Sequence, residues 1–140
     1  MAGFAGRAGG GVIRVVVVTP ERAVLDARAD FVVLPLYDGE IGVGKGHAAF
    51  VGQLGPGEFR YAEGGTTHRY FIDGGFAQVR TDEVTVLTAK ATPAADVSAA
   101  AADTQRAAAE ALPVTTPAER TTREKAIARA SAMGRVAAKN

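Results

Sequence analysis

The residues best placed to do chemistry form the glycine-rich run Gly39-Glu-Ile-Gly-Val-Gly44-Lys45. This run matches the first seven positions of the phosphate-binding P-loop, whose backbone amides and lysine bind nucleotide phosphates. A P-loop continues with Ser or Thr, which binds Mg²⁺, and it opens a helix. Here Gly46 follows, and the segment up to Gly52 is short and bounded by glycines. The pattern therefore favours a glycine-rich connection in a β domain over a nucleotide site.

The two histidines, His47 and His68, offer little imidazole chemistry, and the chain contains no cysteine. His47 has no acidic residue nearer in sequence than Glu40, and no nucleophile motif accompanies it. The favoured interpretation is a turn histidine whose ring bonds to the backbone. His68 precedes an expected strand and is interpreted as a surface residue. We therefore predict no catalytic residue, no metal site and no bound cofactor.

Length and charge narrow the classes of function further. A chain of 140 residues predicts one domain with an appendage. Its 16 Lys and Arg balance 15 Asp and Glu, which gives no electrostatic case for nucleic acid. No apolar run approaches the roughly 18 residues that a membrane span needs. Residues 1–11, glycine-rich with the single cation Arg7, predict a flexible lead-in and not a secretory signal.

A sharp change of composition near Thr92 predicts a β domain over residues 12–91 and a helical domain over 92–140. Inward Ala77 and Val79 alternate with outward Gln78 and Arg80, as in a half-buried strand. Strands are expected at 12–18, 23–25, 31–34, 58–61, 69–72 and 84–87. Turn signals lie at 38–39, 55–57, 63–65, 73–75 and 81–82. These patterns predict an antiparallel sandwich or barrel.

The alanine-rich tail predicts an antiparallel pair of helices. Residues 94–112 contain ten alanines, the best helix former, with Thr92 expected to cap this helix and Pro93 at its first position. The second helix is expected to begin at the capping box Thr116-Pro117-Ala118-Glu119. The tail has few large apolar side chains, so it should pack only loosely on the sandwich. Those side chains are Val97, Leu112, Val114, Ile127, Met133 and Val136.

The second helix is the basic part of the tail. Residues 117–140 carry six Lys and Arg against Glu119 and Glu124, a net charge of +4. Such a helix is a candidate for binding an acidic partner, and a solvated polar face is the alternative interpretation. The candidate residues are Arg120, Arg123, Lys125 and Arg129.

Five short motifs, taken in order, resemble the epsilon-subunit family of F-type ATP synthases, called delta in mitochondria. The motifs lie at 18–25, 29–35, 39–43 with 46–47, 74–76 and 84–87, and the alanine-rich tail follows them. The resemblance implies a sandwich of about ten strands followed by a helix-turn-helix. It also implies a subunit without an active site, in the central stalk at the cytoplasmic face of a bacterial inner membrane.

The resemblance implies partners for particular residues. The sandwich would bind the gamma shaft and the c-ring, coupling ring rotation to ATP synthesis. The hairpin would transiently contact the alpha/beta head and inhibit hydrolysis. His47 would lie near gamma. The residues expected to face the ring are Asp38, Gly39, Glu40 and Gly42.

Two departures from the family pattern affect these expectations. The loop Gly44-Lys-Gly-His-Ala-Ala49 lacks the two prolines that the family commonly has, which predicts a more flexible loop. Ser98 and Ala101 stand where some members carry the Asp and Arg of an ATP-binding segment, so we predict no ATP binding. Two alternatives stay open: a nucleotide-binding enzyme using residues 39–45, and a free-standing β-sandwich adaptor whose basic helix binds an acidic partner.

Overall fold

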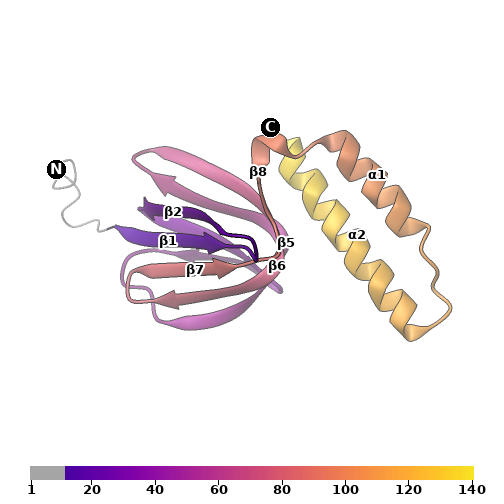
Figure 1. Ribbon diagram of the computed structural model, residues 1–140, viewed down its shortest axis with the longest axis horizontal. Coiled ribbons are helices and arrows are strands. Elements are labelled where there is room, and N and C mark those ends of the chain that lie inside the picture. Colours follow the sequence, from indigo (N-terminus) through magenta and orange to yellow (C-terminus); the bar gives the residue numbers. More distant parts are fainter. Residues whose placement is uncertain (1–11) are drawn as a thin grey trace.

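The computed structural model describes residues 12–140, and the predicted lead-in over residues 1–11 lies outside them (Figure 1). Strands form one end of the molecule, and two helices lie side by side at the other. The strands are β1 (Ile13–Val18), β2 (Ala23–Ala29), β3 (Phe31–Leu36), β4 (Gly39–Val43), β5 (Phe50–Glu63), β6 (Thr66–Arg80), β7 (Glu83–Leu87) and β8 (Ala91–Pro93). The helices are η2 (Ala94–Asp96), α1 (Ala99–Glu110) and α2 (Pro117–Ala138).

The strands run in the order β2-β1-β7-β6-β5-β3-β4, and β8 pairs with a separate stretch of β6. All pairs are antiparallel except β1 with β7. The predicted sandwich and helical hairpin are confirmed, with eight strands in the described residues instead of about ten. β5 and β6 are long, at 14 and 15 residues, and each extends well beyond the one strand predicted within it, at 58–61 and at 69–72.

Two of the predicted turns, at 55–57 and 73–75, are bends inside these long strands. The bends lie opposite each other, because Leu54 pairs with Gly75 and Gly57 with Ile72. Gly75 has φ +114°, and a Cβ there would lie 2.0 Å from the carbonyl oxygen of Leu87. Beyond this bend β6 exchanges its neighbour β8 for β7. The glycines therefore bend the sheet, whereas the predicted turns at 63–65 and 81–82 do join strands.

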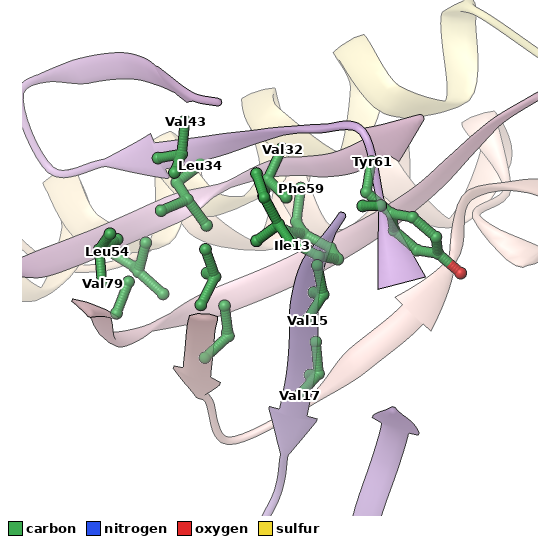
Figure 2. Packing of buried hydrophobic residues seen from close by; sticks show 14 of the residues in the cluster. Ile13, Val15, Val17, Val32, Leu34, Val43, Leu54, Phe59, Tyr61 and Val79 are labelled. Atoms are coloured by element: carbon green, nitrogen blue, oxygen red, sulfur yellow. The ribbon is translucent and has the colours of Figure 1, made fainter. Parts of the chain in front are cut away.

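The core of the sandwich contains strand residues alone. Figure 2 shows Ile13, Val15 and Val17 in a row along β1, each at most 2% exposed. Phe59 of β5 is fully buried among them. Because neither α1 nor α2 contributes to this cluster, the sandwich has a core of its own.

The two helices begin in different ways. At α2 the predicted capping box is confirmed: Thr116 Oγ1 accepts from the Glu119 amide at 3.1 Å, and Glu119 accepts from the Thr116 amide at 3.0 Å. The prediction that Thr92 caps the first helix is wrong. Thr92 lies in β8, where it pairs with Phe71 of β6, and Ser98 is the N-cap of α1. Val97 interrupts the helical path, since its extended backbone places a 7% exposed side chain in the interface with the sandwich. In residues 12–140 no helix combines the length and the apolarity needed to cross a membrane.

Candidate functional site

The glycine-rich segment singled out in the sequence is a strand, not a loop. Gly39–Val43 forms β4, which pairs only with β3 and is an edge of the sheet. No helix follows it before β5 begins at Phe50. Because a P-loop lies between a strand and a helix, the nucleotide-binding alternative is wrong.

The β3–β4 turn carries the acidic residues predicted to face the ring. Asp38 is exposed, and the neighbouring Tyr37 is 70% exposed. Gly39 has φ +139° and nothing within 4 Å of an added Cβ, so backbone conformation alone explains the glycine. Glu40 accepts a hydrogen bond from Arg60 Nη1 at 3.0 Å, and this contact raises the pKa of Arg60. The turn thus presents an aromatic ring and a carboxylate to solvent.

Gly42 has a packing role. A Cβ at this position would lie 2.5 Å from Phe31 Cζ, so the ring of Phe31 lies across the strand where a side chain would stand. Phe31 is nevertheless 46% exposed. The absence of a side chain at Gly42 therefore allows the ring of Phe31 to pack against β4.

His47 lies beyond the opposite end of β4 from Asp38, so the structure does not bring the predicted site residues together. Its ring Nδ1–H donates to the Ala48 carbonyl at 2.8 Å, and the ring centroid is 5.5 Å from that of Phe50. The preceding Gly46 amide donates to Asp82 Oδ1 at 3.0 Å. The interpretation of His47 as a turn histidine bonded to backbone is confirmed.

A row of apolar side chains on the outer face of the sheet was missed by the sequence reasoning. Val51, Phe76 and Leu87, on the neighbouring strands β5, β6 and β7, are 69%, 55% and 52% exposed. Phe76 pairs with both Gln53 and Leu87, and Val51 lies two residues from Gln53, so all share one face. The alternation of β6 was the available signal, since it places Phe76 outward with Gln78. We call Val51, Phe76 and Leu87 the outer apolar row.

The basic residues of α2 are mostly engaged within the hairpin. Arg120 donates to the Val114 carbonyl at 3.2 Å, and Arg123 donates to the Glu110 carbonyl at 3.4 Å. Arg129 forms an ion pair with Asp73 of β6 at 2.7 Å. Lys125 is exposed and contacts no partner in the described part of the chain.

The hairpin packs on the sandwich through a small second cluster centred on Phe71 of β6 and Met133 of α2. Its other members are Ala94, Val97, Ala102, Ala132, Val136 and Ala137. Beside it, Glu58 of β5 accepts from Lys139 Nζ at 3.0 Å, a contact that the sequence reasoning missed. A groove of about 750 Å³ separates the β3–β4 turn from α2. Within residues 12–140 no group of three or more His, Asp or Glu could hold a metal ion.

Comparison with known proteins agrees with this architecture. Residues 12–94 match the family described as "ATP synthase, Delta/Epsilon chain, beta-sandwich domain". The ATP synthase epsilon chain of Rhodopirellula baltica is 47% identical over 118 residues, covering 84% of this chain and 92% of the relative. That of Granulibacter bethesdensis is 41% identical over 96 residues, covering 68% and 71%.

Solved structures show the same fold. A chain in the Euglena gracilis mitochondrial ATP synthase, a structure of OSCP, F1 and c-ring, matches with a TM-score of 0.80 and 27% identity, covering 92% of this chain and 82% of that one. A chain from the central stalk and c-ring of the Tetrahymena thermophila enzyme matches with a TM-score of 0.71. At 13% identity, with 89% and 96% covered, the second match supports the fold alone.

Proposed function

The chain belongs to the ATP synthase delta/epsilon chain family, and from this membership we infer that it is a non-catalytic, central-stalk subunit of an ATP synthase. In this role it transmits rotation of the c-ring through gamma to the catalytic head, where ATP is made. It is attached peripherally to the cytoplasmic face of a bacterial inner membrane through its partners.

We propose that the outer apolar row binds gamma, and this row is the observation on which the assignment of partners rests. Single exposed apolar side chains are ordinary, but three on adjacent strands form a contiguous patch of the kind that protein partners cover. An apolar hollow beside Leu87, lined by Val18 and Pro20, extends the patch. Because strand pairing fixes the backbone of all three residues, this surface loses little backbone freedom when a partner binds.

The β3–β4 turn is assigned to the c-ring. It is the exposed end of the β3–β4 hairpin, and it carries Tyr37 and Asp38 on a backbone fixed by Gly39. Glu40 contributes less free charge, because Arg60 holds its carboxylate. His47 orients the loop after β4 through its ring-to-backbone bond, at the end of the sandwich opposite this turn.

A pull-down of the tagged chain from its native membranes tests both assignments. The wild-type protein is expected to recover gamma with the alpha and beta subunits. Phe76→Ser and Leu87→Ser should each weaken recovery of gamma about tenfold, as expected for an interface residue whose truncation costs somewhat more than about 1 kcal/mol. Val114→Ser is the matched control, since Val114 is 46% exposed in the hairpin loop, away from the sandwich surface.

The result for the wild-type protein also separates this role from the adaptor alternative. Recovery of no ATP synthase subunit would overturn the proposal and leave a free-standing adaptor. Equal recovery of gamma with Phe76→Ser and Val114→Ser would keep the stalk role but remove the outer apolar row from it. An Asp38→Asn variant that retains gamma but loses the ring subunit would support the assignment of the turn.

The basic face of α2 is assigned to the inhibition of ATP hydrolysis through acidic segments of the head. Lys125 is free for this in the docked hairpin, whereas Arg120 and Arg123 first have to release backbone carbonyls. Arg129 has to leave Asp73. The brake therefore requires the hairpin to leave the position seen here.

A triple variant, Arg120→Gln, Arg123→Gln and Lys125→Gln, tests the brake in the assembled enzyme. ATPase activity is expected to rise while the subunit composition stays unchanged. Removing three cations from the sandwich (Arg22, Arg28 and Lys90) is the control for net charge. Unchanged hydrolysis in the triple variant would remove the brake from the proposal.

A further inference from the structure

Glu58 of β5 is far more withdrawn from water than the other ion-paired carboxylates of residues 12–140. Its side chain is 7% exposed, whereas the others range from 30% at Asp73 to 56% at Asp26. A carboxylate at this depth stays ionised only when cations and hydrogen-bond donors surround it. The groups that contact Glu58 therefore decide what it does.

Two of these groups belong to the sandwich and do not depend on the hairpin. Arg60, two residues along β5, donates to Glu58 Oε1 at 3.2 Å. Arg69 of β6 donates from Nε to Oε2 at 2.7 Å. Arg60 also forms an ion pair with Glu40, whereas the one ion pair of Arg69 in residues 12–140 is with Glu58, which makes Arg69 the closer partner. The two strands therefore hold the carboxylate charged and in position.

The remaining contacts reach the last turn of α2. Lys139, the C-cap of α2, donates from Nζ to Glu58 Oε1 at 3.0 Å. Arg69 donates from Nη2 to the Val136 carbonyl at 3.0 Å, and this helix-end carbonyl also accepts from the Lys139 amide at 3.3 Å. Asn140 accepts from Arg69 and donates to the Ala94 carbonyl at 2.7 Å. Glu58 thus holds α2 directly through Lys139 and indirectly by orienting Arg69.

The apolar part of the same interface is thin. The residues that α2 buries there are Ala132, Met133, Val136 and Ala137, two of them alanines. Alanine contributes little apolar surface, so the charged contacts make up a large share of what holds the helix. A second charged contact, Arg129 with Asp73, lies toward the other end of the interface, where Arg129 also lies 6.0 Å from the ring centroid of Phe71.

We propose that Glu58 is a charge latch that holds the last turn of α2 on the sandwich through Lys139 and Arg69. While Lys139 donates to Glu58, the hairpin stays docked. When this contact breaks, the last turn of α2 separates from the sandwich first and undocking begins there. Arg60 and Arg69 keep the carboxylate ready to accept Lys139 again. Only the consequence for hydrolysis rests on the proposed function, because the latch itself is a property of the isolated chain.

Hydrogen exchange of the full chain, read by mass spectrometry, tests the latch. Lys139→Gln should speed amide exchange in the last turns of α2 about fivefold, the effect expected from losing a hydrogen bond to a charge whose partner lysine is exposed. Lys139→Arg should restore protection. Lys125→Gln removes the same charge from an exposed site on the same helix and should leave amide exchange in the last turns of α2 unchanged. Equal exchange in Lys139→Gln and Lys125→Gln would overturn the latch.

Glu58→Gln provides the second arm. If Lys139 acts through Glu58, the variant that combines Glu58→Gln with Lys139→Gln should exchange no faster than Glu58→Gln alone. Exchange rates that rise by the product of the two single effects would count against the latch. The ATPase activity of the assembled enzyme carrying Lys139→Gln separates the two proposals. Faster exchange with lower hydrolysis is expected, because an undocked hairpin can reach the head. Faster exchange with unchanged hydrolysis would keep the latch and remove the brake, and lower hydrolysis without faster exchange would remove the latch and keep the brake.

Discussion

The sandwich and the hairpin of this chain are held together by different forces. The sandwich buries branched and aromatic side chains completely, among them Val15, Val84 and Phe59, and its strands are tied by continuous hydrogen bonding. The hairpin rests on the sandwich through alanines, one methionine and a few charged contacts. A part that has to keep its shape is built on apolar burial, which is large and insensitive to salt. The proposed movement of the hairpin requires contacts that can be broken and remade one at a time, and the charged contacts of its interface are of this kind.

The largest predicted effect is a failure of the sandwich when Phe59 is truncated. Phe59 is fully buried, with Tyr61 and Tyr70 at ring-centroid distances of 6.0 and 6.1 Å. Phe59→Ala should lower the free energy of unfolding by about 3–5 kcal/mol, the usual cost of an emptied aromatic site. Urea denaturation followed by near-ultraviolet tyrosine dichroism measures it.

The same experiment on Met133 sharpens the comparison. Met133 is the large α2 side chain in the interface, and Met133→Ala should release the hairpin, seen as faster exchange in α2, while the urea midpoint of the sandwich stays near that of the wild type. A midpoint that falls as far as in Phe59→Ala would show that hairpin and sandwich unfold as one cooperative unit, and the contrast drawn here would fail.

The second prediction concerns the bend in β6. Gly75→Ala forces a Cβ to within 2.0 Å of the Leu87 carbonyl oxygen at φ +114°, which should cost roughly 2–3 kcal/mol of sandwich stability through overpacking and strain. Gly65→Ala is the matched control, because Gly65 has φ +85° but open space around it and should lose only about 1 kcal/mol. Equal losses, measured by thermal unfolding, would show that backbone strain alone sets the cost.

These glycines also show how far the sequence could predict the fold. Alternation and the capping box predicted the sandwich and the start of α2, because both signals are local. Gly64 and Gly74 give the same local signal, yet one lies in a hairpin turn and the other inside β6. A positive φ marks a sharp change of direction, and only long-range pairing decides whether the chain then reverses or continues.

The contacts of the hairpin were beyond local reasoning for a related reason. Glu58 and Lys139 are 81 residues apart, and nothing near either residue indicates the other. The outer apolar row was closer to prediction, since strand alternation already placed Phe76 outward. The signal was an apolar residue, Phe76, at a position of the strand where alternation predicts a solvent-facing side chain.

The third prediction is that acid weakens the docking of the hairpin. Burial raises the pKa of Glu58, but hydrogen bonds from Arg69 and Lys139 more than offset this and hold the pKa below its ordinary value. The stabilisation is therefore present above the unfolded pKa of about 4.3 and is lost as pH falls through the lower folded value. One contact with an exposed lysine should account for about 1 kcal/mol.

Exchange in α2, compared between pH 6 and acid after correction for intrinsic rates, measures this loss. Arg60, Arg69 and Lys139 are the cations that face Glu58, and Glu40 acts on it through Arg60. Glu58→Gln should remove most of the pH dependence, because the amide does not titrate in this range. Acid sensitivity that survives in Glu58→Gln would place its origin in another carboxylate.

The smallest predicted effect is a stabilisation, and it concerns a glycine in α2. Gly134 lies inside α2 with nothing within 4 Å of an added Cβ, so no packing contact requires a glycine there. Gly134→Ala should stabilise the helix by roughly 0.5–1 kcal/mol, because alanine loses less backbone entropy on folding. Slower exchange in α2, with the sandwich unchanged, is the expected readout.

In the assembled enzyme a stiffer hairpin that still docks should shift hydrolysis only slightly, whereas a large change in hydrolysis without a change in exchange would mean that Gly134 contacts a partner. In that case Gly75 would be required by packing within the chain and Gly134 by contact with a partner, and the two glycines would no longer contrast a rigid sandwich with a permissive hairpin.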